Sequence, residues 1–203
     1  MRILFDSTFP ARNRSGIGVY GRELLAALRR AAPPAWDIDT LMRDLARHRG
    51  GHARFVEKKT IALLDKPVAS SGELLYAPPA RLEKRTVLPK PELLLLDGDT
   101  LTLERGKQKF TVRLAQQPEA LAFVDSLRGT LNGDKAALER SYKLRLSGTE
   151  QRWTLDLLPD DQRIASFVVR ITIGGSRNQV EWIQYLQADG DSSVMTIEPL
   201  ENQ

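Results

Sequence analysis

Apolar and polar side chains alternate along much of the stretch 55–103. A period of two is typical of β-strands, since successive side chains point to opposite faces of a sheet. Two leucine-rich runs in this stretch flank Asp97 and Gly98, a pair that favours a tight hairpin because the turn needs positive φ at both central residues. Pro78 and Pro79 cannot donate ladder hydrogen bonds and predict a break between strands. The pattern therefore predicts an antiparallel meander.

The same alternation recurs outside this stretch, in runs bounded by glycine, proline or aspartate. Alternation of this kind is typical of half-buried strands. The further predicted strands are 53–61, 110–114, 142–146, 153–157, 167–173, 180–187 and 193–198. Within the meander, the alternation in 82–87 gives one charged edge, which we do not interpret as a nucleic-acid patch.

Three segments after Pro34 are predicted to be helices. The first, 36–48, places four apolar side chains at i, i+3, i+4 and i+7, and Asp37 suits its positive N-terminal end. The second, 118–131, begins with a proline, which fits the first helical position. The third, 135–142, follows Asp134, a residue type that caps helices. The apolar stripe of the second helix consists of Leu121, Val124, Leu127 and Leu131.

The predicted elements follow the order helix, strands, two helices, strands. Such runs favour an α+β domain with an antiparallel sheet. A sheet of this kind either flattens into a packed sandwich or curls into a half-barrel. A curled sheet leaves a concave apolar face that other elements have to cover.

Composition removes several classes of function. The 203 residues include 30 basic and 26 acidic side chains, a net charge of +4. Because the two signs interleave, the charge favours a mixed, solvated surface over a nucleic-acid interface. The sequence has no cysteine, which excludes disulfides, thiolate nucleophiles and zinc sites of the cysteine type. No run approaches the roughly 18 apolar residues of a membrane span.

The polar side chains form no recognisable catalytic or metal-binding motif, and we predict no catalytic residue, metal or cofactor. His48 and His52 are the only histidines, and we interpret both as surface residues. Three aspartate pairs lie beside turn-forming glycine or proline, where aspartate is favoured for backbone reasons. They are Asp97 and Asp99, Asp160 and Asp161, and Asp189 and Asp191. We expect the aromatic residues Trp153, Trp182 and Tyr185 to pack within the sheet.

Residues 1–33 differ in pattern from the rest of the chain and are predicted to be an N-terminal appendage that ends at a boundary near Pro34. Their order of strand, glycine loop and helix resembles the start of glycosyltransferases with two Rossmann-like lobes. The resemblance rests on Arg2–Asp6 and Gly16–Tyr20, and the acidic pair of that family has no counterpart in the chain. The longest apolar run within residues 1–33, at 24–28, is shorter than the roughly 7–15 residues of an export-signal core. No signal peptide is recognised.

From about Trp36 to Pro199 the chain resembles the LolA-like proteins, relatives of the periplasmic carrier that takes lipoproteins to the outer membrane. Each matching motif is short, and their order and spacing carry the resemblance. The motifs are Phe55-x-Glu57, Leu64-x-x-Pro67, Ser71-Gly72-x-Leu74, Pro79-x-Arg81-Leu82, Asp97-Gly98-Asp99, the run Arg128 to Asp134, Leu146-x-Gly148, and Gly190-Asp191-x-Ser193-x-Met195-x-Ile197.

The resemblance implies that residues 34–203 form an incomplete, half-open antiparallel barrel whose concave apolar face is covered by helices. It also implies a cavity that hides acyl chains from water, and a lid that opens for release. We assign the lid to 118–131, hinged at 116–117 and 132–133. The expected lipid-binding residues of cavity and lid are Tyr76, Leu82, Leu94, Leu96, Leu101, Leu103, Leu121, Val124, Leu127, Leu131 and Leu155.

In function, the resemblance implies a non-enzymatic periplasmic carrier of a lipoprotein or another lipid, moving its acyl chains towards the outer membrane. Its partners would be an inner-membrane donor protein and an outer-membrane acceptor protein, and we expect a monomer that binds no nucleic acid. Two alternatives remain open. A closed interaction domain predicts a sheet without an internal cavity, and a glycosyltransferase fragment predicts sugar-nucleotide binding that is lost with residues 1–33.

Two features depart from the family pattern. Pro78 stands where the housekeeping carriers have an arginine associated with lid contacts and cargo transfer, which puts lipoprotein-specific handling in doubt and leaves apolar-chain binding untouched. Residues 1–33 occupy the place of a signal peptide, which we interpret as a misassigned start or a fusion. Retention of Met1 in the native protein, measured by N-terminal sequencing, would contradict that interpretation.

Overall fold

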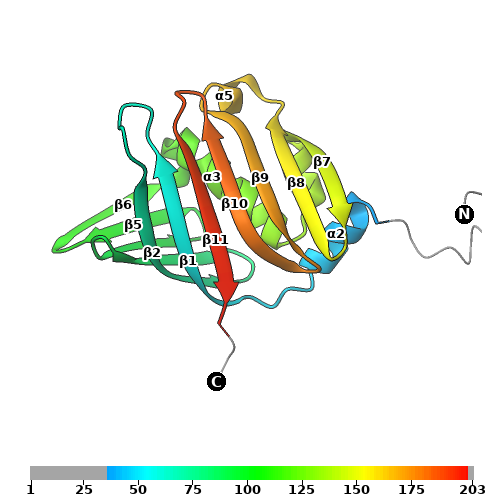
Figure 1. Ribbon diagram of the computed structural model, residues 1–203, viewed down its shortest axis with the longest axis horizontal. Helices are drawn as coiled ribbons and strands as arrows, with labels where there is room; N and C mark the ends of the chain where they lie inside the picture. The colour runs from blue at the N-terminus through cyan, green and yellow to red at the C-terminus, as the bar shows by residue number, and fades with distance from the viewer. Residues whose placement is uncertain (1–35, 201–203) are drawn as a thin grey trace, which may run out of the picture. The chain divides into compact units, whose positions relative to one another are not determined.

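The computed structural model describes residues 36–200 (Figure 1). The predictions for residues 1–33 lie outside the described residues. In the described part, a single antiparallel sheet of eleven strands runs in the order β6-β5-β4-β3-β2-β1-β11-β10-β9-β8-β7. The strands are β1 (Gly51–Thr60), β2 (Val68–Ala77), β3 (Arg81–Leu88), β4 (Glu92–Asp97), β5 (Thr100–Arg105), β6 (Gln108–Arg113), β7 (Tyr142–Thr149), β8 (Arg152–Pro159), β9 (Val168–Ser176), β10 (Gln179–Gln187) and β11 (Ser192–Pro199).

The sheet consists of two meanders, β1 to β6 and β7 to β11. They are joined by the antiparallel pairing of β1 with β11, in which Phe55 lies opposite Ile197. The outermost strands, β6 and β7, are not paired with each other in the described structure, so the sheet curves without closing. The prediction of a half-open antiparallel barrel is confirmed.

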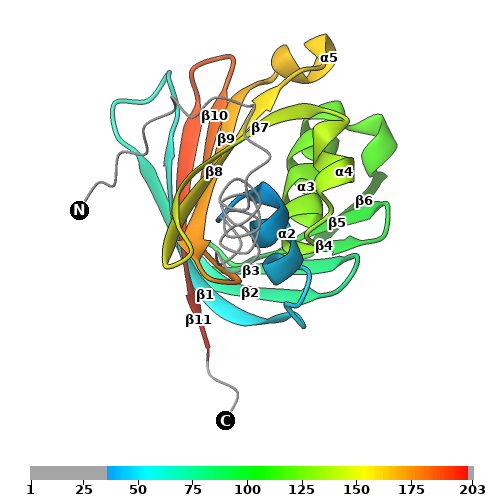
Figure 2. The ribbon, with the colours of Figure 1, turned by 90° about the vertical axis from the view of Figure 1, so that its right-hand side faces the viewer.

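Three of the described helices, α2, α3 and α4, lie on the concave side of this sheet (Figure 2). The described helical segments are α2 (Ile38–Leu45), the 3₁₀ turn η1 (Leu114–Gln116), α3 (Pro118–Leu131), α4 (Lys135–Glu139) and α5 (Gln162–Ala165). The Asp37 carboxylate caps α2 by accepting a hydrogen bond from the Thr40 amide at 2.8 Å. The Asp134 carboxylate caps α4 in the same way.

Local chemistry explains most element boundaries. Helix α3 begins at Pro118, where a missing N–H costs no intrahelical bond. The β4–β5 turn lies one residue later than the Asp-Gly pair predicted, because Asp97 pairs with Thr100 and the two turn residues are Gly98 and Asp99. Gly98 has the expected positive φ, +55°, whereas Asp97 does not have a positive φ. Helix α5 was not predicted, because its four residues are too few to show a helical period.

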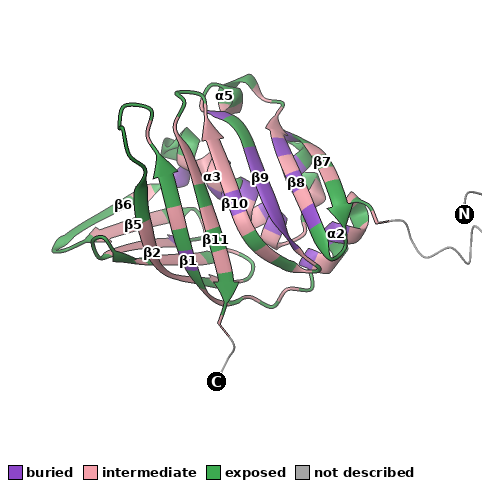
Figure 3. Ribbon diagram, viewed as in Figure 1, coloured by how far each residue is buried: buried purple, intermediate pink, exposed green. Residues whose placement is uncertain are grey.

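The main core lies between α2, α4 and strands β7 to β10. Buried positions concentrate on β8 and β9, as Figure 3 shows. The core residues are Leu41, Met42, Leu45, Ala122, Leu138, Tyr142, Trp153, Leu155, Leu157, Val168, Ile171, Ile173 and Ile183. A second, smaller cluster consists of Leu96, Leu114 and Val124. The concave face is therefore filled beside β7 to β9 and less completely filled beside β1 to β5.

Candidate functional site

A cavity of about 430 Å³ lies between the concave face of the sheet and α3. Its floor includes Leu82, Leu96 and Leu101, from three neighbouring strands. On the α3 side, its lining residues are Ala120, Phe123, Val124, Leu127 and Leu131. The volume is within the range of about 300–1,000 Å³ that is usual for small-molecule sites.

Strand register explains why apolar side chains meet on this floor. Tyr76 lies opposite Leu82, Leu82 opposite Leu96, and Leu96 opposite Leu101, so the four side chains form one row across β2 to β5. Directly opposed residues project on the same face of a sheet. A second row lies on the same face, two residues away from the first on each strand. It consists of Leu74, Lys84, Leu94 and Leu103.

Eight of the eleven residues expected at the site line this cavity. They are Tyr76, Leu82, Leu94, Leu96, Leu101, Val124, Leu127 and Leu131. The other three are not among its lining residues. Leu103 is half-buried on β5, and Leu121 packs against the small core cluster. Leu155 is fully buried in the main core, because α2 and α4 fill the concave face beside β8. Contact with lipid stays a prediction for the whole set.

Several lining residues were not singled out from the sequence. Met195 and Ile197 on β11, and Ile183 on β10, complete the wall. The alternation in 193–198 places Met195 and Ile197 on one face of the strand, but it does not reveal that this strand pairs with β1. That pairing joins segments about 140 residues apart, which local patterns do not report.

The two histidines, which we expected at the surface, are partly exposed and also line the cavity. His48 Nδ1 accepts a hydrogen bond from the Gly50 amide at 3.1 Å, and burial lowers the pKa of His48. His52 Nε2 lies 3.0 Å from a carboxylate oxygen of Glu73. They follow the end of α2 at the start of β1, where the chain enters the sheet.

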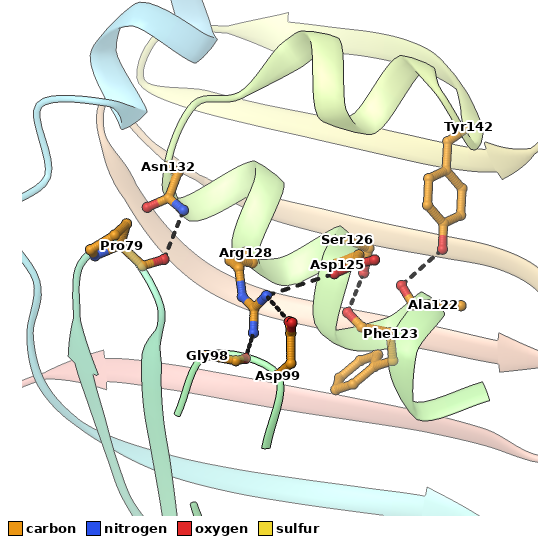
Figure 4. A network of polar contacts seen from close by, with 10 residues as sticks. All are labelled: Pro79, Gly98, Asp99, Ala122, Phe123, Asp125, Ser126, Arg128, Asn132 and Tyr142. Carbon is orange, nitrogen blue, oxygen red and sulfur yellow. Dashed lines mark hydrogen bonds and ion pairs between the residues drawn. The ribbon is translucent and has the colours of Figure 1, made fainter. Parts of the chain in front are cut away.

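Polar contacts join the C-terminal half of α3 to two loops of the sheet (Figure 4). The Arg128 guanidinium donates to the Gly98 carbonyl and lies 3.9 Å from the Asp99 carboxylate. Asn132 Nδ2 donates to the Pro79 carbonyl at 2.9 Å, and its Oδ1 accepts from the Tyr76 hydroxyl. The hydrogen-bond donors to both loops, Arg128 and Asn132, come from the C-terminal end of α3. Pro78, in one of the two loops, has no side-chain donor.

The N-terminal half of α3 is held mainly by packing. The Tyr142 hydroxyl donates to the Ala122 carbonyl at 3.0 Å, and burial raises the pKa of Tyr142 well above its usual value. The rings of Phe123 and Tyr185 meet edge to face, with centroids 5.1 Å apart. Burial raises the pKa of Tyr185 to about 12. Tyr185 thus packs against the helix, in line with the role expected from strand periodicity.

Two of the three aspartate pairs supply caps and turn contacts to the backbone. Asp161 caps α5 and accepts from the Arg163 amide at 2.7 Å, and hydrogen bonds from Arg163 lower its pKa to about 2. Asp189 accepts from the Asp191 amide, and Asp191 accepts from the Ala62 amide, each at 2.9 Å. Within residues 36–200, acidic and histidine side chains form no group of three or more suited to a metal ion. No helix in this part of the chain is both long and apolar enough to span a membrane.

Fold and cavity together define a class of protein: an open half-barrel of antiparallel strands with an apolar cavity beneath a covering helix. Residues 30–197 match the model of a family described as outer membrane lipoprotein carrier protein LolA-like. The match spans well over half of the sequence, and the chain belongs to this LolA-like family. Members of the family are periplasmic.

Several solved structures are similar to this chain at low sequence identity. The LolA superfamily protein NE2245 from Nitrosomonas europaea is 10% identical, with a TM-score of 0.46 over 83% of this chain and 96% of its own. MucB in the MucA/MucB complex of Pseudomonas aeruginosa is 16% identical, with a TM-score of 0.44 over 81% of this chain and 59% of that one. LprF from Mycobacterium bovis is 10% identical, with a TM-score of 0.34 over 79% and 91%. A comparison with curated protein sequences gives no match.

Proposed function

We propose that this protein is a non-enzymatic periplasmic carrier that shields the acyl chains of a lipoprotein or another lipid and moves them towards the outer membrane. The observation that supports the proposal is the 430 Å³ apolar cavity beneath α3. Each buried methylene contributes about 0.8 kcal/mol, so one long chain supplies on the order of 10 kcal/mol before the entropic costs of association. The proposed partners are an inner-membrane donor protein and an outer-membrane acceptor protein.

Release of cargo requires the cavity to open, and we assign this movement to α3. The helix lies over the floor leucines, and the proposed hinges 116–117 and 132–133 lie at its two ends. Gln116 is the last residue of the 3₁₀ turn η1 and Gln117 has non-helical backbone angles, whereas Asn132 still has right-handed helical angles. Gly133 has a φ of +63°, and a Cβ there would lie 2.0 Å from the Met42 carbonyl oxygen. The C-terminal hinge is therefore restricted to glycine at this position.

Removing the polar contacts of α3 should make the helix open more readily. We expect the double variant Arg128→Ala/Asn132→Ala to exchange the amide hydrogens of α3 at least about tenfold faster than the wild type. Each lost hydrogen bond contributes about 1 kcal/mol, and local opening governs exchange. Hydrogen–deuterium exchange with mass spectrometry measures the effect.

The matched control is Arg105→Ala, which breaks the exposed pair of Arg105 with Glu92 on neighbouring strands. Equal exchange of α3 in the wild type and the double variant would contradict the role of these contacts.

The proposed function is tested by expressing the full chain behind an export signal, purifying it from the periplasm and recording native mass spectra. We expect bound acyl lipid, identified after extraction, and uptake of a fluorescent fatty acid by the delipidated protein. A folded protein that carries no lipid and takes up no probe would contradict the carrier function.

The closed interaction domain is less well supported, since it requires a sheet without an internal cavity. The glycosyltransferase alternative depends on residues 1–33, and its test is sugar-nucleotide binding by the full chain and by a variant that lacks them.

A further inference from the structure

The cavity wall contains one ion pair among its apolar residues. Lys84 occupies the second cross-strand row, directly opposite Leu74 on one side and Leu94 on the other. Its ammonium group contacts the carboxylate of Glu57 on β1, and both residues line the cavity. Glu57 lies opposite Met195, another lining residue, so the pair lies on the same face of the sheet as the floor leucines.

Both partners of this pair are largely withdrawn from water. The side chains of Lys84 and Glu57 are 27% and 17% exposed. Lys84 Nζ lies 4.9 Å from the centroid of the Phe55 ring, which is itself 1% exposed. Taking two charges out of water is costly, and well-packed apolar residues in the place of such a pair are often equally or more stable. Packing alone therefore does not explain a charged pair in this wall.

Lys84 has hydrogen-bonding capacity beyond the Glu57 contact. An ammonium group carries three donors, and the described structure gives Nζ one hydrogen bond, to Glu57. A ligand group that accepts hydrogen bonds and carries negative charge is the best partner for the remaining donors. An apolar wall around such a donor strengthens the interaction, because the local dielectric constant is low.

The cavity volume limits how much chain accompanies that group. A cavity of about 150 Å³ holds benzene, which corresponds to roughly 25 Å³ for each carbon atom. On that scale 430 Å³ holds roughly 17 carbon atoms, or one long acyl chain. Two or three chains of that length need two or three times the volume.

Building on the proposed lipid-binding function, we propose that the cavity takes a single-chain lipid with an anionic head group, and that Lys84 binds this head group. The chain lies over the floor leucines beneath α3, and the carboxylate or phosphate reaches the Lys84 ammonium. Glu57 keeps Lys84 neutralised in the empty cavity and repels the incoming anion. Its removal therefore strengthens binding, whereas removal of Lys84 weakens it.

The test measures displacement of a neutral fluorescent probe, N-phenyl-1-naphthylamine, from the full chain at mildly alkaline pH, where carboxylates are ionised. The competing ligands are palmitate, monohexadecyl phosphate and the neutral alcohol 1-hexadecanol, which share one chain length. We expect Lys84→Met to weaken the binding of both anions about tenfold, the usual effect of losing one charge-assisted hydrogen bond. We expect Glu57→Gln to tighten the binding of both anions several-fold. Neither change should alter hexadecanol binding by more than about twofold, because the alcohol carries no charge.

The neutral alcohol also reports whether each variant is folded, since it needs only the apolar cavity. Lys84→Arg keeps the charge and should retain most of the affinity for the anions. The stronger-binding anion of the two then identifies the head group as a carboxylate or a phosphate. Dipalmitoyl phosphatidic acid, with two chains, should bind at least about tenfold more weakly than the single-chain anions.

Two sets of outcomes separate this inference from the proposed function. Equal losses of palmitate and hexadecanol in Lys84→Met, or no loss of either, would overturn the head-group assignment and leave the carrier function standing. Two-chain lipid binding as tight as palmitate would overturn the single-chain assignment. Failure of the wild type to bind the probe or any of the lipids would overturn the proposed function together with the inference.

Discussion

Changing Leu127 to glutamate should abolish lipid uptake. Leu127 lies on the cavity side of α3, opposite the floor leucines, and it also packs against the main core. A carboxylate at this position would have to be buried without a partner when an acyl chain enters, at a cost of several kcal/mol. We expect the affinity for a fluorescent fatty acid to fall by at least about 100-fold, as measured by titration.

The matched control for this experiment is Leu63→Glu. Leu63 is 93% exposed in the connection between β1 and β2, so the same chemical change there should leave lipid affinity within about twofold of the wild type. Circular dichroism and urea unfolding establish whether each variant is folded. A folded Leu127→Glu protein that binds the fatty acid as tightly as the wild type would exclude α3 from the site.

Changing Trp153 to alanine should lower the free energy of unfolding by about 3–5 kcal/mol. The indole is 1% exposed in the main core, and its Nε1 donates to the Arg177 carbonyl at 2.9 Å. It lies directly over Gly175, where a Cβ would come within 2.8 Å of the ring. The alanine variant therefore loses both a large apolar contact and a hydrogen bond. The expected loss is a large part of the roughly 5–15 kcal/mol that stabilises a typical domain.

Urea unfolding measures this loss, with far-ultraviolet circular dichroism as the signal because it does not depend on tryptophan fluorescence. Val169→Ala is the control on the neighbouring strand β9, because Val169 is 49% exposed and its truncation should cost no more than about 0.5 kcal/mol. A Trp153→Ala protein that unfolds within about 1 kcal/mol of the wild type, on the order of a surface substitution, would show that the indole is not central to the core.

The architecture was largely predictable because its strands and helices are specified locally. Alternation located most strands, and the leucine run beside the Asp-Gly pair located β4. The proline at 118 and the aspartates at 37 and 134 placed the helix starts correctly. The joining of β1 to β11 was not predictable in this way. It depends on the curvature of the whole sheet, which no window of neighbouring residues reports.

The candidate site was predictable where strand alternation and the apolar face coincide. Tyr76, Leu82 and Leu96 follow directly from the period-two pattern and the hairpin register. Leu155 obeys the same pattern, but α2 and α4 occupy the space in front of it. Which part of an apolar face stays open depends on where the helices dock, and helical periodicity alone does not fix that position.

Lys84 was missed because it belongs to a charged run. The alternation in 82–87 indicated one charged edge, and in the structure Glu83 and Arg85 do pair with each other at 2.7 Å. Lys84 points to the other face, with Leu82, where its partner Glu57 comes from a different strand. A single charged residue on the apolar face of a strand indicates a polar position in the site. Counting the charges of the whole run hides this residue, because its neighbours on the other face are charged as well.

The unpaired outer strands leave the curvature of the sheet less constrained than in a closed barrel. In a closed barrel, strand number and register set the diameter, and any widening breaks ladder hydrogen bonds. Here the ten ladders of the described sheet end at β6 and β7, so a slight change of twist at each ladder alters the curvature while every interstrand bond is kept. In the proposed carrier, small changes of curvature can therefore accompany the entry of one acyl chain without the loss of a ladder hydrogen bond.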